Sequence, residues 1–212
     1  VSNEEDAVLG IVDLASGKRT QGIEVGKEPE GVKVSADGKT VYVTSEVASL
    51  VHVIDVASGK VVKNVQVGKR PRRFALTPDG RQLWVTNELA ASVTVLSTQD
   101  HSVLGTVKFE VKGARAADIT PVGITMTADG KRAFVALGKA NHVAFVDVAG
   151  RKVDKLVLAG KRAWGVTLNR AEDRLYVVNG LSDDLTIIDV PAAKALKTVA
   201  VGRVPYGVVI AE

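Results

Sequence analysis

The chain has 212 residues, of which 46% are hydrophobic and only 4% are aromatic, and it contains no cysteine, which excludes disulfides and thiolate metal sites. Its 28 basic and 24 acidic residues leave a net charge of +4, too thin an excess for the dense basic patch typical of nucleic-acid-binding proteins. No apolar run approaches the roughly 18 residues of a membrane-spanning helix. We therefore expect no nucleic-acid partner and no membrane span.

A unit of constant length recurs along the chain. The run VGKEPEGVKVSADGKTVYVT, which starts at Val25, returns as VGKRPRRFALTPDGRQLWVT from Val67, and weaker copies follow. The equivalent proline-like positions are separated by 42, 50, 42 and 42 residues; they are Pro29, Pro71, Pro121, Ala163 and Pro205. A fixed period of this size predicts copies of one supersecondary unit packed against one another.

The predicted elements are short strands. Residues 1–3, 8–14 and 18–25 form three of them, and the next unit shows four, which we name a to d, at 31–34, 40–44, 50–56 and 61–67. Asp37-Gly38 separates a from b and is a strong hairpin signal, because both central positions of the favoured tight turn need positive φ. Four antiparallel strands per unit, without helical periodicity, are the signature of a β-propeller blade.

The later units repeat these strands, and the last segment, 204–211, has the pattern of strand a alone. We predict a single all-β domain, a β-propeller of four-stranded antiparallel blades in which this last segment completes the N-terminal blade, so that the chain holds five blades. The predicted repeats are 1–25 plus 203–212, 26–67, 68–117, 118–159 and 160–202.

Several motifs resemble a known family. VYVTSE (41–46), LWVTNE (83–88) and LYVVNG (175–180) resemble the YVTN class of bacterial propellers. More narrowly, RPRRFALTPDGRQLWVTNE (70–88) and VGRVPYGVVI (201–210) resemble the propellers associated with pyrroloquinoline-quinone (PQQ)-dependent catabolism. This resemblance implies an exported protein, periplasmic or secreted, without well-defined enzymatic activity, beside quinoprotein alcohol-oxidation systems. It also implies about seven blades, so five blades leave open a closed ring, a truncated seven-bladed propeller or an open arc.

A binding site is predicted on one face. In a propeller the d-to-a and b-to-c links gather around the channel mouth, and here they combine basic, acidic, amide and aromatic side chains, which suit a small anionic ligand or a protein partner. An alternative is that the lysines are solvated turn residues and that the aromatic side chains only fill the centre of the propeller. The candidate binding residues are Arg72, Arg73, Trp164, Tyr206, Glu30, Arg162, Glu46, Asn87, Glu88 and Asn179.

Two departures from the repeat stand out. The first is Arg72-Arg73. The other units carry glycine at the second of these two positions, so the long side chain of an arginine there needs a defined direction. We predict that it points into the channel mouth, either as a ligand contact or as a structural partner of Glu46 or Glu88. The second is an insertion near 111–120, which could act as a lid, a docking loop or inert decoration.

The chain shows no catalytic signature. Its three histidines occupy different positions in their units, and no nucleophile elbow, phosphate loop or zinc-protease motif occurs. No catalytic residue, metal or cofactor is predicted. Three functions follow, of which we favour the first: a non-enzymatic exported binding or scaffold protein, a lyase or lactonase acting at the channel mouth, or an assembly module whose free edges pair with another chain. The oligomeric state stays open.

Overall fold

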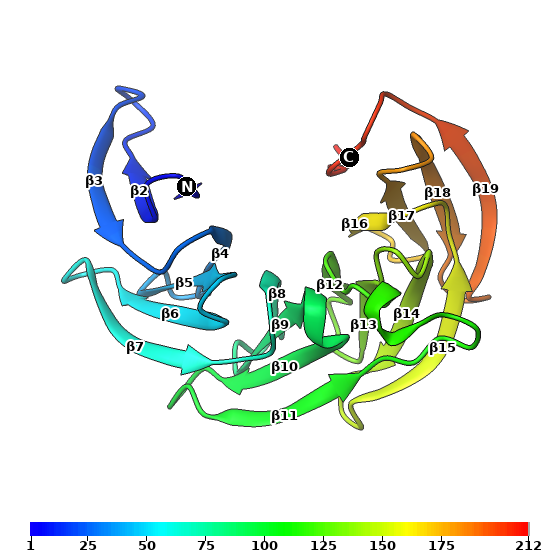
Figure 1. Cartoon of the computed structure of the whole chain (residues 1–212), viewed down its shortest axis with the longest axis horizontal. Helices are drawn as coiled ribbons and strands as arrows, with labels where there is room; N and C mark the ends of the chain where they lie inside the picture. Colours follow the sequence, from blue (N-terminus) through cyan, green and yellow to red (C-terminus); the bar gives the residue numbers. More distant parts are fainter. Residues whose placement is uncertain (212) are drawn as a thin grey trace.

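The computed structural model, which describes residues 1–211, forms five antiparallel sheets arranged side by side in an arc (Figure 1). The prediction of an all-β propeller is therefore confirmed, while Glu212 of the predicted first blade lies outside the described residues. Among residues 1–211, the helical elements are two short 3-10 turns, η1 (Glu88–Ala90) and η2 (Ala116–Asp118). None of the helical segments in this part of the chain has the length and apolarity to cross a membrane.

Each sheet follows the chain order, so that the first strand is innermost and the last is outermost (Figure 1). The first sheet has three strands: β1 (Ser2–Asn3), β2 (Val8–Val12) and β3 (Arg19–Glu24). The second and third are β4 (Pro29–Val34), β5 (Thr40–Ser45), β6 (Leu50–Asp55), β7 (Lys60–Gln66), and β8 (Pro71–Leu76), β9 (Gln82–Asn87), β10 (Ser92–Ser97), β11 (Val103–Lys108). The fourth and fifth are β12 (Ile124–Met126), β13 (Arg132–Ala136), β14 (His142–Asp147), β15 (Lys152–Leu158), and β16 (Ala163–Leu168), β17 (Arg174–Asn179), β18 (Asp184–Asp189), β19 (Lys194–Ala200).

The core lies between neighbouring blades. Along β5, Val43 belongs to the cluster shared with Leu9 of the first blade, whereas the adjacent Tyr42 belongs to the cluster shared with Phe74 and Leu83 of the third. Successive side chains of a strand point to opposite faces, so both faces of this sheet are buried. That double burial explains why the inner strands are nearly continuous apolar runs, and why β-branched residues dominate them.

Threonine side chains of the VYVT and LWVT motifs join one blade to the next. The Thr44 hydroxyl accepts from the backbone N–H of Gly31, at 2.7 Å, and donates to the carbonyl of Arg72, at 3.2 Å. Thr86 in the following blade donates to the carbonyl of Val122 at 2.8 Å. These bonds satisfy backbone groups of the inner strands and hold neighbouring blades in register.

The predicted closure of the ring is wrong. The described residues after β19 form no strand, the first sheet keeps three strands, and the two chain ends lie on opposite sides of a gap (Figure 1). The C-terminal segment instead follows the fifth blade, where a Cβ added to Gly165 would lie 2.9 Å from the carbonyl oxygen of Tyr206. The reason is geometric, since the packing of each blade on the next sets a rotation that five blades do not complete.

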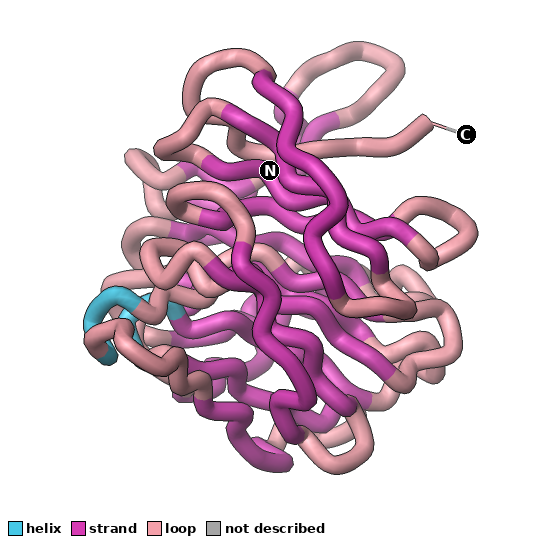
Figure 2. The backbone as a smooth tube through the Cα atoms, turned by 90° about the vertical axis from the view of Figure 1, so that its right-hand side faces the viewer, coloured by secondary structure: helices cyan, strands magenta, loops and turns pink. Residues whose placement is uncertain are grey.

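The strands cross the molecule between two faces that carry the loops (Figure 2). One face collects the a-to-b and c-to-d turns, such as Asp37-Gly38 and Ser58-Gly59. The other collects the d-to-a and b-to-c links, to which both 3-10 turns belong. The fold therefore brings the most variable parts of the repeats together on one side.

Candidate functional site

A cavity of about 620 Å³ lies at the mouth of the arc, where links from every blade meet. Its volume is within the range of small-molecule sites. It is lined by Glu4, Glu28, Glu30, Glu46, Arg70, Arg72, Glu88, Leu89, Thr120, Lys139, Arg162, Trp164 and Tyr206. Another cavity, of about 520 Å³, lies on the outer rim between β11 and β15 and contains none of the predicted site residues.

The structure brings seven of the ten predicted residues to this mouth cavity, namely Arg72, Trp164, Tyr206, Glu30, Arg162, Glu46 and Glu88. Arg73 lies next to it, on a smaller cavity that it shares with Tyr206. Whether these residues bind a ligand stays a prediction.

Asn87 and Asn179 do not line the cavity. Both are fully buried, and Asn87 donates to the hydroxyls of Ser92 and Thr94 within its own blade, at 3.2 and 2.9 Å. Asn179 likewise donates within the fifth blade, to the carboxylate of Asp184 at 2.6 Å and to the hydroxyl of Thr186 at 2.9 Å. A Cβ on the link residue Gly68 would lie 2.6 Å from Asn87 Cγ, so the link packs directly over this amide and hides it. The amide part of the predicted ring is thus structural.

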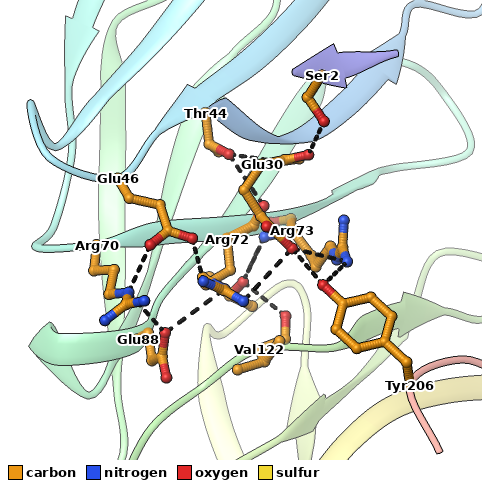
Figure 3. A network of polar contacts seen from close by, with 12 residues as sticks. Ser2, Glu30, Thr44, Glu46, Arg70, Arg72, Arg73, Glu88, Val122 and Tyr206 are labelled. Carbon is orange, nitrogen blue, oxygen red and sulfur yellow. Dashed lines mark hydrogen bonds and ion pairs between the residues drawn. The ribbon is translucent and has the colours of Figure 1, made fainter. Parts of the chain in front are cut away.

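Arg72 is the centre of a buried ionic network (Figure 3). Its guanidinium bonds to Glu46 Oε1 through Nη1, and it lies 3.5 Å from Glu30 Oε1 and 3.6 Å from Glu88 Oε2. Its side chain is only 8% exposed, and the three carboxylates come from two blades. The structural alternative for Arg72 is therefore realised: it points into the mouth and pairs there with both predicted partners, Glu46 and Glu88.

Arg70 shares the same carboxylates. Its Nε lies 2.6 Å from Glu46 Oε2 and 3.2 Å from Glu88 Oε2. Burial raises the pKa of Glu46, and the charges of Arg72 and Arg70 oppose that rise. Two guanidinium groups are thus held rigidly by carboxylates, and their charges are largely neutralised within the protein.

Tyr206 links the C-terminal segment to the second and third blades (Figure 3). Its hydroxyl donates to Glu30 Oε1 at 2.7 Å and accepts from Arg73 Nη2 at 2.7 Å, while Arg73 also lies 2.9 Å from Glu30 Oε1. Burial raises the pKa of Glu30, but the Tyr206 hydroxyl and the charges of Arg72 and Arg73 lower it more, so the pKa falls below its ordinary value of 4.5.

The hydrogen bond from Tyr206 to Glu30 predicts an acid-sensitive contribution to stability. Because the folded state lowers the pKa of Glu30, the contribution is present above pH 4.5 and is lost as the pH falls through the lowered pKa. Since Tyr206 is half exposed, we expect Tyr206→Phe to lower the free energy of unfolding by about 1 kcal/mol at pH 7. Urea unfolding at pH 7 and at about pH 3 tests this, and a loss that does not shrink in acid would contradict it.

Trp164 forms the aromatic part of the cavity wall. The guanidinium carbon of Arg162 lies 4.3 Å from its ring centroid and that of Arg72 lies 5.2 Å away. The Tyr206 ring is 5.9 Å away in a tilted arrangement. Trp164 is only 7% exposed, and its buried indole Nε1–H has no hydrogen-bond acceptor among the described residues.

Six lining residues were not among the predicted candidates: Glu4, Glu28, Arg70, Leu89, Thr120 and Lys139. Thr120 ends the insertion, and its hydroxyl accepts from the backbone N–H of Lys139 at 2.9 Å. The insertion is anchored, because Val111 and Ile119 are buried in the core shared by the third and fourth blades. The only signal for Lys139 was its place beside a b-to-c tip, which is weak in a chain rich in lysine.

Two family models match the sequence. Residues 64–210 match the model described as a lactonase, 7-bladed β-propeller, and residues 1–77 match the model of YNCE-like β-propellers. No curated protein has a matching sequence.

Solved structures share the fold at low sequence identity. A protein from Lactobacillus plantarum superposes with a TM-score of 0.84 at 19% identity, over 97% of this chain and 69% of its own. Hydrazine synthase from Kuenenia stuttgartiensis gives 0.73 at 22% identity, over 87% and 53%. The dihydro-heme d1 dehydrogenase NirN gives 0.75 at 19%, over 93% and 42%. The chain thus spans about half the length of these two enzyme chains, and the similarity concerns the fold alone.

Proposed function

We propose that this chain, which belongs to the lactonase family of seven-bladed β-propellers, is a non-enzymatic exported binding propeller that serves a quinoprotein oxidation system from the periplasm or outside the cell. The resemblance of residues 70–88 and 201–210 to PQQ-associated propellers supports this setting. The proposal assigns binding to the channel mouth, where a protein partner or a small anionic ligand is held.

The observation that carries the binding role is the make-up of the mouth cavity. Its lining consists mainly of carboxylates, cationic side chains and two aromatic rings, together with Leu89 and Thr120, and contains no histidine, serine or cysteine among the described residues. Arg70 and Arg72 are fixed by Glu46 and Glu88, so the wall is rigid before a ligand arrives. Such preorganised charge favours recognition, whereas the usual pairing of nucleophile and base has no counterpart here.

The direct test measures the binding of a soluble PQQ-dependent alcohol dehydrogenase by titration calorimetry at two salt concentrations. We expect saturable binding that weakens at high salt, and at least tenfold weaker binding for Arg162→Met, which removes a charge at the mouth. Arg81→Met is the matched control, because Arg81 is an exposed arginine of the a-to-b turn on the opposite face. Equal affinity of both variants would place the contact elsewhere, and absence of binding would refute the association.

Lactone hydrolysis is the second candidate, because the family model over residues 64–210 carries that activity in its description. In this case a buried carboxylate of the mouth, Glu88, would be the base that activates water. A pH-stat assay with simple lactones tests it. Turnover that is lost in Glu88→Gln and kept in the control Glu172→Gln would make the protein an enzyme and replace our first proposal.

A further inference from the structure

The charges at the channel mouth fall into two groups. Arg70, Arg72 and Arg73 are each paired with a carboxylate. Arg162 and Lys139, on the side of the fourth and fifth blades, are in no ion pair among the residues that the structure describes. One side of the cavity therefore keeps positive charge that no ion pair neutralises; the nearest acidic influence on it is Asp118, whose pKa the charge of Lys139 helps to lower.

The same side holds an unsatisfied donor. Three buried side-chain atoms without a hydrogen-bond partner belong to the cavity wall: Arg72 Nε, Glu88 Oε2 and Trp164 Nε1. The first two lie 3.6 Å apart and have ionic contacts. Trp164 Nε1 has no hydrogen-bond partner among the described residues, and the atom is itself shielded from solvent, so a ligand acceptor reaches it only after a side-chain movement at the mouth. Leaving such a donor unpaired costs about 1–3 kcal/mol, which a ligand acceptor would offset.

Arg162 is held in place over the ring of Trp164. Its guanidinium stacks on the Trp164 ring at 4.3 Å, and its backbone N–H donates to Asn141 Oδ1 at 2.8 Å. Stacking uses the face of the guanidinium and leaves the N–H groups at its edge free. These edge donors match the two oxygens of a carboxylate, which can accept two parallel bonds.

The charge of the whole lining limits the ligand. Five glutamates, at positions 4, 28, 30, 46 and 88, face four cations, at positions 70, 72, 139 and 162, so five negative charges against four positive leave −1. A multiply charged anion would be repelled by the glutamates of the other side, whereas a single negative charge next to Arg162 and Lys139 is stabilised.

We propose that the mouth binds a monocarboxylate, whose carboxylate group accepts hydrogen bonds from the guanidinium of Arg162 and from the indole Nε1–H of Trp164. Lys139 adds a second positive charge. This inference rests on the proposed binding role of the mouth and names the chemical class of its ligand. Neither the identity of a protein partner nor PQQ enters into this ligand class.

The test uses the two tryptophans of the chain, Trp84 and Trp164, which give two indole N–H signals in a ¹H–¹⁵N spectrum. Trp84 is fully buried and donates to Gln82 Oε1 at 3.2 Å, so its signal is an internal reference, and Trp84→Phe assigns the pair. We expect benzoate to shift the Trp164 signal saturably, with a Kd below about 1 mM, and the Trp84 signal to stay in place. Benzamide, which has the same shape without charge, should leave both unchanged.

Arg162 supplies the matched variants. We expect Arg162→Met to weaken benzoate binding at least tenfold and Arg162→Lys, which keeps the charge but loses the planar donor fork, to weaken it less. Arg81→Met should bind like the wild type. An unchanged Trp84 signal verifies that each variant is folded. If Arg162→Met does not fold, the benzoate affinity of Arg162→Lys is the deciding measurement.

The inference is overturned if benzamide shifts Trp164 as benzoate does, if no shift occurs, or if both Arg162 variants bind benzoate with wild-type affinity. Binding of the dehydrogenase is measured in parallel. A protein that binds the dehydrogenase but not benzoate refutes this inference alone. One that binds benzoate but not the dehydrogenase supports it and removes the quinoprotein association.

Discussion

Arg72→Met is expected to lower the free energy of unfolding by about 3–5 kcal/mol, because three buried carboxylates are then left with only two counter-charges, those of Arg70 and Arg73. Glu30, Glu46 and Glu88 all lie within ion-pair distance of this guanidinium and are each less than 10% exposed. Methionine fills part of the space but cannot compensate the charges. Urea unfolding at pH 7, with the midpoint and slope compared, measures the loss.

The neighbouring arginine provides the control. Arg73 also pairs with Glu30, but its side chain is 35% exposed, so Arg73→Met should cost about 1 kcal/mol or less. Adding Glu46→Gln to Arg72→Met should recover part of the loss, because two carboxylates, Glu30 and Glu88, then face the two remaining cations, Arg70 and Arg73. If Arg72→Met and Arg73→Met are equally mild, the network contributes little to stability.

Gly31→Ala is expected to destabilise the protein by about 3 kcal/mol, through a clash between two blades. A Cβ at this position would lie 2.1 Å from the carbonyl oxygen of Arg72 on the next blade, a backbone atom that cannot move alone. The Gly31 N–H bond to Thr44 would be displaced as well. Thermal and urea unfolding should both report the loss.

Gly207→Ala is the matched control, because Gly207 occupies the same position of the repeat but has no atom within 4 Å of an added Cβ. It should change stability by no more than about 0.5 kcal/mol. Equal effects at Gly31 and Gly207 would show that the cost lies in the glycine backbone itself and not in blade packing.

Arg73 is the equivalent residue of the third blade. It takes the position of Gly31 and keeps the bond from its backbone N–H to a threonine, at 2.9 Å from Thr86 Oγ1. The next inner strand, β12, follows the insertion and begins at Ile124, three residues after the proline position at which β4 and β8 start. The inner strand after the insertion is thus shorter than the inner strands of the second and third blades.

Repeat spacing was sufficient for the blades because blade formation is local. The hairpin turn at Asp37-Gly38, the alternation along β5 and the length of each link act within about forty residues. The same spacing placed Arg72, Trp164 and Tyr206 on one face, since equivalent positions of stacked units lie side by side. The misplaced candidates were Asn87 and Asn179, because periodicity cannot tell a buried amide from an exposed one.

The repeat pattern was thus sufficient to predict the all-β blade, the number of units and the face that carries the candidate site. The open arc of five blades was not predictable from the repeat, because ring closure depends on a small rotation at each interface, summed over all of them. Nor does the repeat tell which charges at the mouth are neutralised. Arg70 and Arg162 occupy equivalent link positions, yet the first pairs with the carboxylates of Glu46 and Glu88 and the second lies over Trp164. That difference arises from contacts between residues far apart in the chain.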